Sequence, residues 1–164
     1  CVTSTSAGRL FDAVSAVLGI RRRVSFEGEA AMFLEYAAHA AGTAEALKLP
    51  TLKETEGRFL LPTGALFDSI VKRKLTGEAA ELLAAQFHDA LARQIVMGCE
   101  RARELTGIKT AALSGGVFQN LLLLEKVEAG LKAKDFRVLR HHLIPPNDGG
   151  ICLGQAVVAM AKIQ

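Results

Sequence analysis

Apolar residues recur at helical spacing in the first third of the chain. Residues 8–19 (GRLFDAVSAVLG) carry them three and four positions apart, and Gly19 stands where helices often end on glycine. Residues 29–41 (EAAMFLEYAAHAA) repeat this spacing in an alanine-rich run that Gly42 closes. The pattern therefore predicts helices over 8–19 and 29–41.

A short strand and a helix follow. Residues 58–61 (RFLL) predict a strand that Pro62 ends, because proline cannot donate a hydrogen bond to a strand ladder. A helix beginning at Thr63 or at Asp68 is then predicted to run to Lys74.

The longest helical pattern covers residues 77–104. Thr76 is a suitable N-cap, Glu78 and Glu81 complement the helix dipole, and Gly107 lies where the helix should end. One face of this predicted helix is formed by Ala80, Leu83, Phe87, Leu91, Ile95 and Gly98.

The last third of the chain alternates between strand and helix. Residues 109–113 and 136–140 predict strands, and helical patterns over 117–131 and 150–163 follow them. This β-α-β-α order is typical of a sheet covered by helices. We therefore assign the chain to the α/β class.

The composition is that of a globular protein. The chain has 164 residues, half of them hydrophobic, and a formal net charge of +3, so disorder is excluded. No apolar run reaches the length of a membrane span, and no signal peptide is visible. Cys1, Cys99 and Cys152 lie too far apart for a disulfide framework or a zinc site, which fits a reducing cytoplasm. We expect a cytoplasmic location and, because the chain opens on Cys, a start inside a longer protein.

The charge pattern argues against a nucleic-acid partner. Basic residues are scattered, and the densest cluster, Arg21–Arg23, is more typical of a surface turn than of a phosphate contact. Aromatic residues make up 5% of the chain and are not interleaved with basic ones, as single-strand stacking would require. We expect neither nucleic acid nor a membrane as a partner.

A glycine pair follows the first strand of the last third. In LSGGVFQN, residues 113–120, the chain passes from strand to helix through Ser114, Gly115 and Gly116. Glycine lets a ligand approach the backbone and a helix N-terminus attracts anions, so this turn suits a phosphate or ribose-phosphate. It is neither a Walker loop nor a Gly-x-Gly-x-x-Gly fingerprint. Spacing alone leaves a tight turn with nothing bound equally open.

A second glycine pair, in PPNDGG at residues 145–150, opens the last predicted helix. Pro145 and Pro146 exclude a strand and a helix interior, so the segment is a stiff loop. Asp148 is then either the N-cap of the helix or a carboxylate that holds a metal ion beside phosphates. From spacing alone the cap is favoured.

The other polar candidates are weaker. His141 and His142 are adjacent, so an extended chain points them in opposite directions, which is a poor geometry for shared ligation. His39 and His88 stand alone on separate predicted helices, and we expect both at the surface or its boundary. We expect Asp12 at an exposed helix position. No Ser-His-Asp order indicates a catalytic triad.

Four blocks of the chain together resemble one family. GRLFDAVSAVLG, FEGEAAMFLE, ALSGGVFQNLLLLE and PPNDGGICLGQA, in this order, are similar to the carboxyl-terminal part of the HypF carbamoyltransferases, from about Thr3 to the end. They are more distantly similar to tRNA threonylcarbamoyl-adenosine synthases and antibiotic O-carbamoyltransferases. These proteins share the actin-like ATPase and sugar-kinase fold, so the resemblance implies a ribonuclease-H-like half of that fold with long additional helices.

The resemblance also implies how much of a family member is present. Residues 1–164 would be the second half of the carbamoyltransferase domain. The acylphosphatase-like, zinc-finger and adenylate-forming domains that precede it in the family are absent. The first half of the domain, with its metal-binding His-x-x-x-His pair, is absent too, so we expect the chain to be inactive by itself.

By the same resemblance, six residues would contact a nucleotide, two of them, Gly8 and Asp12, at the adenosine. Asp148 would bind a divalent metal, for which iron, zinc and magnesium stay open. Glu27 and Gly28 belong to a family block and receive no role. The other four nucleotide contacts lie in or after the first glycine turn: Ser114, Gly115, Gly116 and Asn120.

The implied reaction is carbamoyl transfer. Family members use carbamoyl phosphate and ATP to form carbamoyl-adenylate and pass the carbamoyl group to the carboxyl-terminal cysteine of a HypE-like protein, for the cyanide ligands of nickel–iron hydrogenases. Two alternatives stay open: a non-catalytic interaction module of actin-like fold, and transfer to another acceptor such as tRNA or a small-molecule hydroxyl. The residues leave the catalytic groups unidentified.

Overall fold

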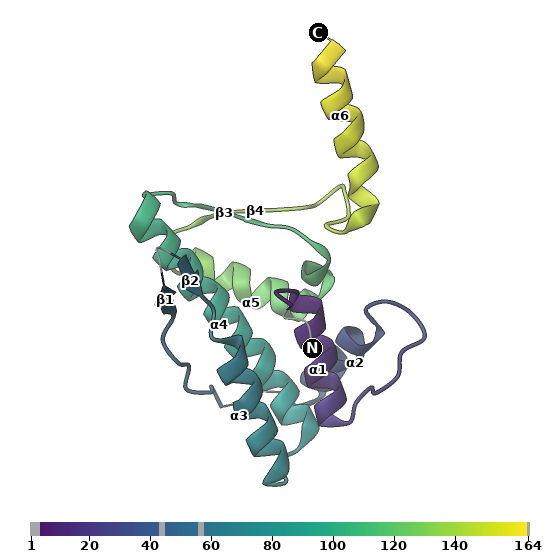
Figure 1. The fold of residues 1–164 in the computed structure, drawn as a ribbon, viewed down its shortest axis with the longest axis vertical. Helices are drawn as coiled ribbons and strands as arrows, with labels where there is room; N and C mark the ends of the chain where they lie inside the picture. Colours follow the sequence, from purple (N-terminus) through teal and green to yellow (C-terminus); the bar gives the residue numbers. More distant parts are fainter. Residues whose placement is uncertain (1–3, 43–44, 56–57, 164) are drawn as a thin grey trace.

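One long central helix organises the molecule (Figure 1). The structure is a computed structural model that describes residues 4–42, 45–55 and 58–163. Its helices are α1 (Ala7–Leu18), α2 (Glu29–Ala40), α3 (Thr63–Leu75), α4 (Ala80–Thr106), α5 (Leu121–Lys132) and α6 (Ile151–Ile163). Its strands and 3-10 turns are β1 (Lys53–Thr55), β2 (Arg58–Leu60), β3 (Thr110–Leu113), η1 (Gly116–Gln119), β4 (Arg137–Arg140) and η2 (Asp148–Gly150).

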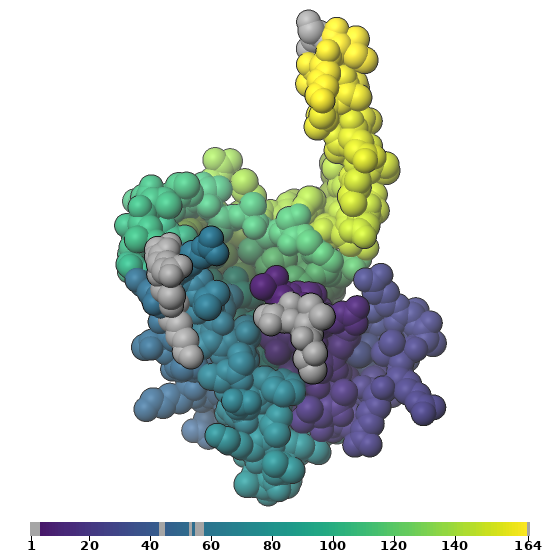
Figure 2. Space-filling view, in the orientation of Figure 1, coloured from purple at the N-terminus to yellow at the C-terminus, as the bar shows by residue number. Residues whose placement is uncertain are grey.

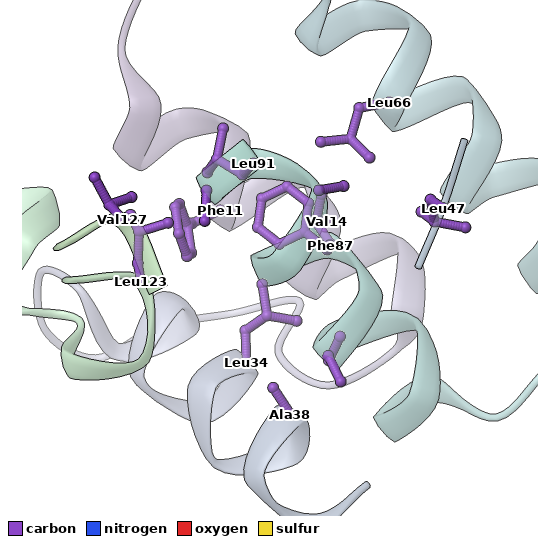
Figure 3. Close-up of a cluster of buried hydrophobic side chains, with 14 of the residues drawn as sticks. Phe11, Val14, Leu34, Ala38, Leu47, Leu66, Phe87, Leu91, Leu123 and Val127 are labelled. Carbon is purple, nitrogen blue, oxygen red and sulfur yellow. The ribbon is translucent and has the colours of Figure 1, made fainter. Parts of the chain in front are cut away.

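The core lies where α4 meets α1, α2, α3 and α5. Between Leu83 and Val96 most side chains of α4 are buried, including several outside the predicted apolar face. Phe87 packs edge-on against Phe11 of α1, with ring centroids 5.0 Å apart. Burying one such side chain contributes about 1.5–3 kcal/mol, so this core holds the helices together. The members labelled in Figure 3 are Phe11, Val14, Leu34, Ala38, Leu47, Leu66, Phe87, Leu91, Leu123 and Val127.

β3 and β4 form a parallel pair that is covered on one face. Leu113 lies opposite Arg140, and α5 connects the two strands as the crossover that parallel pairing requires. Leu113 packs into the core, and Ala111 and Val138 pack partly against it. Leu139, on the other face, is 44% exposed. Parallel sheets normally have both faces covered, so one face of this sheet remains open.

α6 extends away from the rest of the chain (Figures 1 and 2). It contacts η2, and every residue described in it is exposed. A helix that is apolar on all sides is normally a buried helix. No helix among the described residues is long and apolar enough to cross a membrane. The large exposed apolar residues of α6 are Ile151, Leu153, Val157, Val158, Met160 and Ile163.

The structure confirms the α/β class and most of the predicted elements. The helices expected over 8–19 and 29–41 are α1 and α2. Gly19 and Gly107 follow α1 and α4 with φ of 78° and 73°, the left-handed torsions that favour glycine at helix ends. The strand expected over 58–61 is β2, which pairs antiparallel with β1, a strand that the sequence pattern did not predict. α3 begins at Thr63 rather than Asp68.

The predicted N-cap of the longest helix is wrong. Thr76 instead ends α3, where its hydroxyl donates to the carbonyl oxygen of Arg73 at 2.8 Å. Arg73 also holds Glu78 in an ion pair of 2.6 Å, which closes the connection between the two helices. α4 therefore begins only at Ala80, after Ala79, which offers no side-chain cap.

Replacing Gly130 should destabilise the contact between α5 and α4. A Cβ built on Gly130 would lie 2.8 Å from Cγ2 of Val96, a stiff side chain. We expect Gly130→Ala to lower the free energy of unfolding by roughly 1–3 kcal/mol, measured by chemical denaturation. Gly64→Ala in α3, where a Cβ would meet nothing within 4 Å, is the control and should be neutral or stabilising. Equal stabilities of the two variants would contradict the prediction.

Candidate functional site

The carboxyl ends of β3 and β4 lie side by side because the strands are parallel. Leu113 pairs with Arg140, so Ser114 and His141 are the next residues after each strand. Oγ of Ser114 lies 2.8 Å from Nε2 of His141, a hydrogen-bond distance. Two residues far apart in sequence thus meet at the edge where α/β sheets bind ligands.

The two glycine turns border one pocket. The N–H of Gly115 donates to the carbonyl oxygen of Pro146 at 2.9 Å, which joins the turns. Between them lies an open pocket of about 550 Å³, within the range of small-molecule sites. Apolar residues of α6, such as Ile151, line its other side. The polar and glycine lining includes Ser114, Gly115, Gly116, His141, Asn147 and Asp148.

Glycine serves a different purpose at each position. Gly115 has φ 95° and ψ 157°, torsions that other residues rarely adopt. At Gly150 a Cβ would lie 2.9 Å from Cγ2 of Ile144, so space is the restriction there. At Gly116 neither restriction holds, because a Cβ would meet only Cβ of Asn147 at 3.7 Å. What glycine provides at position 116 is an uncovered backbone beside the pocket.

The free N–H groups at this edge belong to η1 rather than to α5. As the first residues of a 3-10 turn, Gly116 and Val117 have no acceptor within the turn. Two N–H groups in the first turn of α5 are already bonded, that of Leu123 to Oδ1 of Asn120 at 2.8 Å and that of Leu122 to Oε1 of Glu35 at 2.9 Å. The predicted helix over 117–131 is therefore wrong at its start, because η1, which begins at Gly116, and the N-cap residue Asn120 precede α5.

Asn147, not Asp148, caps the turn before α6. Its Oδ1 accepts from the N–H of Gly149 at 3.1 Å. Asp148 is the exposed first residue of η2 and lines the pocket. The cap role that spacing favoured for Asp148 is thus wrong, because Asn147 caps this turn.

The described residues do not complete a metal site. No three His, Cys, Asp or Glu residues within 4–42, 45–55 and 58–163 come together as a donor set. His141 and Asp148 share the pocket, which offers one imidazole and one carboxylate. A metal ion bound here would need further ligands from other segments.

Gly8 and Asp12 lie on α1, which contacts η1 beside the pocket. Asp12 is partly buried rather than at the fully exposed position expected, and its side chain lies 3.9 Å from Arg9, a weak surface pair. Neither residue belongs to the pocket lining, and Asn120 does not either. The nucleotide contacts of Gly8, Asp12 and Asn120 therefore stay predictions, whereas the pocket brings together Ser114, Gly115 and Gly116.

His88 is buried, so its predicted place at the surface is wrong. It has 0% exposure and packs edge-on against Phe11 and Phe87. Nδ1 lies 2.8 Å from the carbonyl oxygen of Ala84, and Nε2 lies 3.0 Å from Nδ2 of Asn120. A neutral ring that donates from Nδ1 and accepts at Nε2 satisfies both contacts. Burial lowers the pKa of His88 to about 4, which keeps the ring neutral.

His88 and Asn120 connect the core to the first glycine turn. The Asn120 amide donates to His88 of α4, and its Oδ1 caps α5 directly after η1. The start of α5 is thereby held to the central helix. This bond ties the position of η1 to the most buried element of the fold.

His141 is the pocket residue that the sequence pattern failed to identify. Its adjacency to His142 argued against a shared site, but only His141 lines the pocket. The β-α-β order contained a usable signal, because residues at equal positions after two parallel strands lie next to each other. Counting from Leu113 and Arg140 leads to Ser114 and His141.

The chain is similar to carbamoyltransferases. A family model described as "Carbamoyltransferase, Kae1-like Domain, second subdomain" matches residues 1–155. The chain is 35% identical over 161 residues to carbamoyltransferase HypF of Synechocystis sp. and 41% identical over 162 residues to that of Rhodobacter capsulatus. Each alignment covers 98% of this chain and 20% of the relative. The chain thus spans about one fifth of the length of these curated relatives.

A solved structure shares the fold. The crystal structure of full-length HypF in the phosphate- and nucleotide-bound form matches with a TM-score of 0.84 at 35% identity. The match covers 97% of this chain and 21% of that chain.

The neutral His88 should make stability depend on pH. Its pKa is 6.5 when exposed and about 4 in the fold, so between these values the unfolded chain binds the extra proton. The contribution of the neutral His88 to the free energy of unfolding is then fully present above pH 6.5. It falls by roughly 3 kcal/mol as the pH approaches 4. Denaturant unfolding across this range should show a shallower loss for His88→Gln, although that variant is less stable at neutral pH.

His39, which is exposed, provides the control for this measurement. His39→Gln should keep most of the pH dependence of the unaltered chain, because the charge of His39 is the last and smallest of the causes that lower the pKa of His88. A His88→Gln profile parallel to that of the unaltered chain would show that another group causes the loss.

Proposed function

The chain belongs to the HypF carbamoyltransferase family, and on this basis we propose that its pocket binds an adenine nucleotide during carbamoyl transfer. The observation that carries the proposal is the pocket between the two glycine turns at the ends of β3 and β4. The related HypF structure is in a phosphate- and nucleotide-bound form, which supports this ligand class.

The pocket supplies neutral donors for phosphate oxygens. The N–H group of Gly116 and the hydroxyl of Ser114 would donate to them, while the glycine backbone lets the phosphate approach. The apolar side formed by α6 would exclude water, and this strengthens each polar contact. Donors fixed in advance stabilise charge that develops on phosphate oxygens at little reorganisation cost.

In the proposed reaction, water first cleaves carbamoyl phosphate to carbamate and inorganic phosphate. An oxygen of the carbamate then attacks the α-phosphorus of ATP and displaces pyrophosphate to give carbamoyl-adenylate. Carbamate is a poor electrophile, and the adenylate provides it with a good leaving group. The thiolate of a carboxyl-terminal cysteine on a HypE-like acceptor then attacks the carbamoyl carbon, and AMP leaves. The carbamoylated cysteine would serve the synthesis of cyanide ligands in nickel–iron hydrogenase maturation, in the cytoplasm.

We place residues 1–164 as the second half of the carbamoyltransferase domain. The open face of the β3–β4 pair and the apolar surface of α6 support this, because both require cover that the described residues do not provide. The first half of the domain would supply that cover and the second wall of the pocket. The chain by itself would then bind nucleotide weakly and transfer no carbamoyl group.

Asp148 is the residue of this chain that would ligate a divalent metal. Carboxylate oxygens suit magnesium and also occur on zinc and iron. Because the described residues do not complete a donor set, the remaining ligands would come from the other half of the domain.

Gly116→Val tests the proposed nucleotide site. In the natural full-length protein this change should weaken ATP binding tenfold or more, measured by calorimetric titration, because the new side chain covers the backbone that phosphates approach. The fold should persist, since a Cβ at this position makes only ordinary contact with Asn147. Gly64→Val, in α3, is the control and should bind ATP normally. A change within about twofold for Gly116→Val would contradict the proposal.

Asp148→Asn tests the metal role. Because Asn147 already caps η2, the melting temperature should hardly change. Loss of an anionic oxygen should lower metal content and carbamoyl transfer together in the full-length protein. Asn147→Asp is the matched control, since either residue caps a helical turn, and it should keep the metal. Normal metal content and activity in Asp148→Asn would remove Asp148 from the proposed site.

A further inference from the structure

We propose that His141 is a positioning residue that makes the Ser114 hydroxyl a hydrogen-bond donor to a phosphate oxygen of the bound nucleotide. The inference rests on the proposed function, because it concerns the same pocket. His141 thereby supports the proposed phosphate-binding residues of the glycine turns.

The bond between Ser114 and His141 has two possible directions. If the hydroxyl donates to Nε2, its only hydrogen is used and Ser114 offers the pocket an acceptor. If Nε2–H donates to Oγ, the hydroxyl hydrogen is free to point into the pocket. A phosphate beside Gly116 is an acceptor only, so its binding selects the second arrangement.

This arrangement explains why a histidine stands opposite the serine. An isolated hydroxyl rotates freely and offers its donor and acceptor sides equally to water. With Nε2–H directed at Oγ, the rotation is restricted and the hydroxyl hydrogen is aimed at the ligand, so less ordering remains to be done on binding. The parallel strands hold Oγ of Ser114 and Nε2 of His141 2.8 Å apart.

A purely structural role does not explain why Ser114 and His141 lie at the edge of the pocket. Both side chains are exposed at the pocket edge, where a neutral hydrogen bond adds only about 0.5–1.5 kcal/mol to stability. β3 and β4 are already joined by their own backbone ladder. Removing the pair should therefore change ligand binding much more than folding.

His142 provides a matched control. It is the same residue type at the adjacent position, is exposed, and is absent from the pocket lining. It lies near Glu128, whose pKa is lowered chiefly by a hydrogen bond from Lys132 and slightly by the charge of His142. Replacing His141, which lines the pocket, can thus be compared with replacing His142, which does not.

The experiment measures ATP and adenosine affinities of the full-length protein by calorimetric titration. We expect His141→Ala and Ser114→Ala each to weaken ATP binding about tenfold and to leave adenosine binding and melting temperature unchanged. His141→Gln, whose amide N–H can replace Nε2–H, should recover affinity to within about threefold of the unaltered protein. His142→Ala should bind ATP normally.

The double variant Ser114→Ala/His141→Ala separates a coupled pair from two independent contacts. If His141 acts through Ser114, the double variant should lose no more than the larger single loss, about tenfold. Multiplied losses near a hundredfold would overturn the inference, as would normal ATP affinity of His141→Ala, equal losses for ATP and adenosine, or a parallel fall in melting temperature. If the unaltered protein fails to bind ATP, the proposed function itself is wrong, whereas normal binding with no effect of His141→Ala rejects only this inference.

Discussion

The parallel pairing of β3 and β4 is the constraint on which the rest of the structure depends. Two parallel strands cannot be joined by a hairpin, so α5 must cross between them and pack against α4. The close approach of α5 to α4 requires a glycine at position 130. The same pairing sends both chain segments out at one edge, where the two glycine turns meet. The packing of α5 on α4 and the geometry of the site therefore follow from one arrangement.

Features with a strong local signal were predictable from the sequence. Helical spacing located α1, α2 and most of α4, and glycines marked two helix ends because left-handed torsions disfavour other residues. The first glycine turn was expected to expose backbone at the end of a strand, and Gly115 and Gly116 do line the pocket. In each case the physical cause lies within a few residues of the position concerned.

Features that depend on contacts between distant segments were not predictable. A single histidine such as His88 gives the same helical pattern whether it faces solvent or bonds Asn120. Two neighbouring residues can both cap a turn, and only the folded loop decides that Asn147 does so and Asp148 does not. The adjacency of His141 to His142 indicates nothing of its partner Ser114, which follows a different strand. β1, with the sequence KET, has no apolar signal at all.

A small tilt of α6 at its junction with η2 displaces the far end of the helix. The thirteen residues of α6 form a helix about 20 Å long, so a tilt of about 3° at η2 displaces its far end by about 1 Å. Conversely, any surface that holds the far end to within an ångström sets the orientation of η2, and with it Asp148, to within a few degrees. Contacts made far along α6 would therefore constrain the direction of the chain at η2, where Asp148 lies.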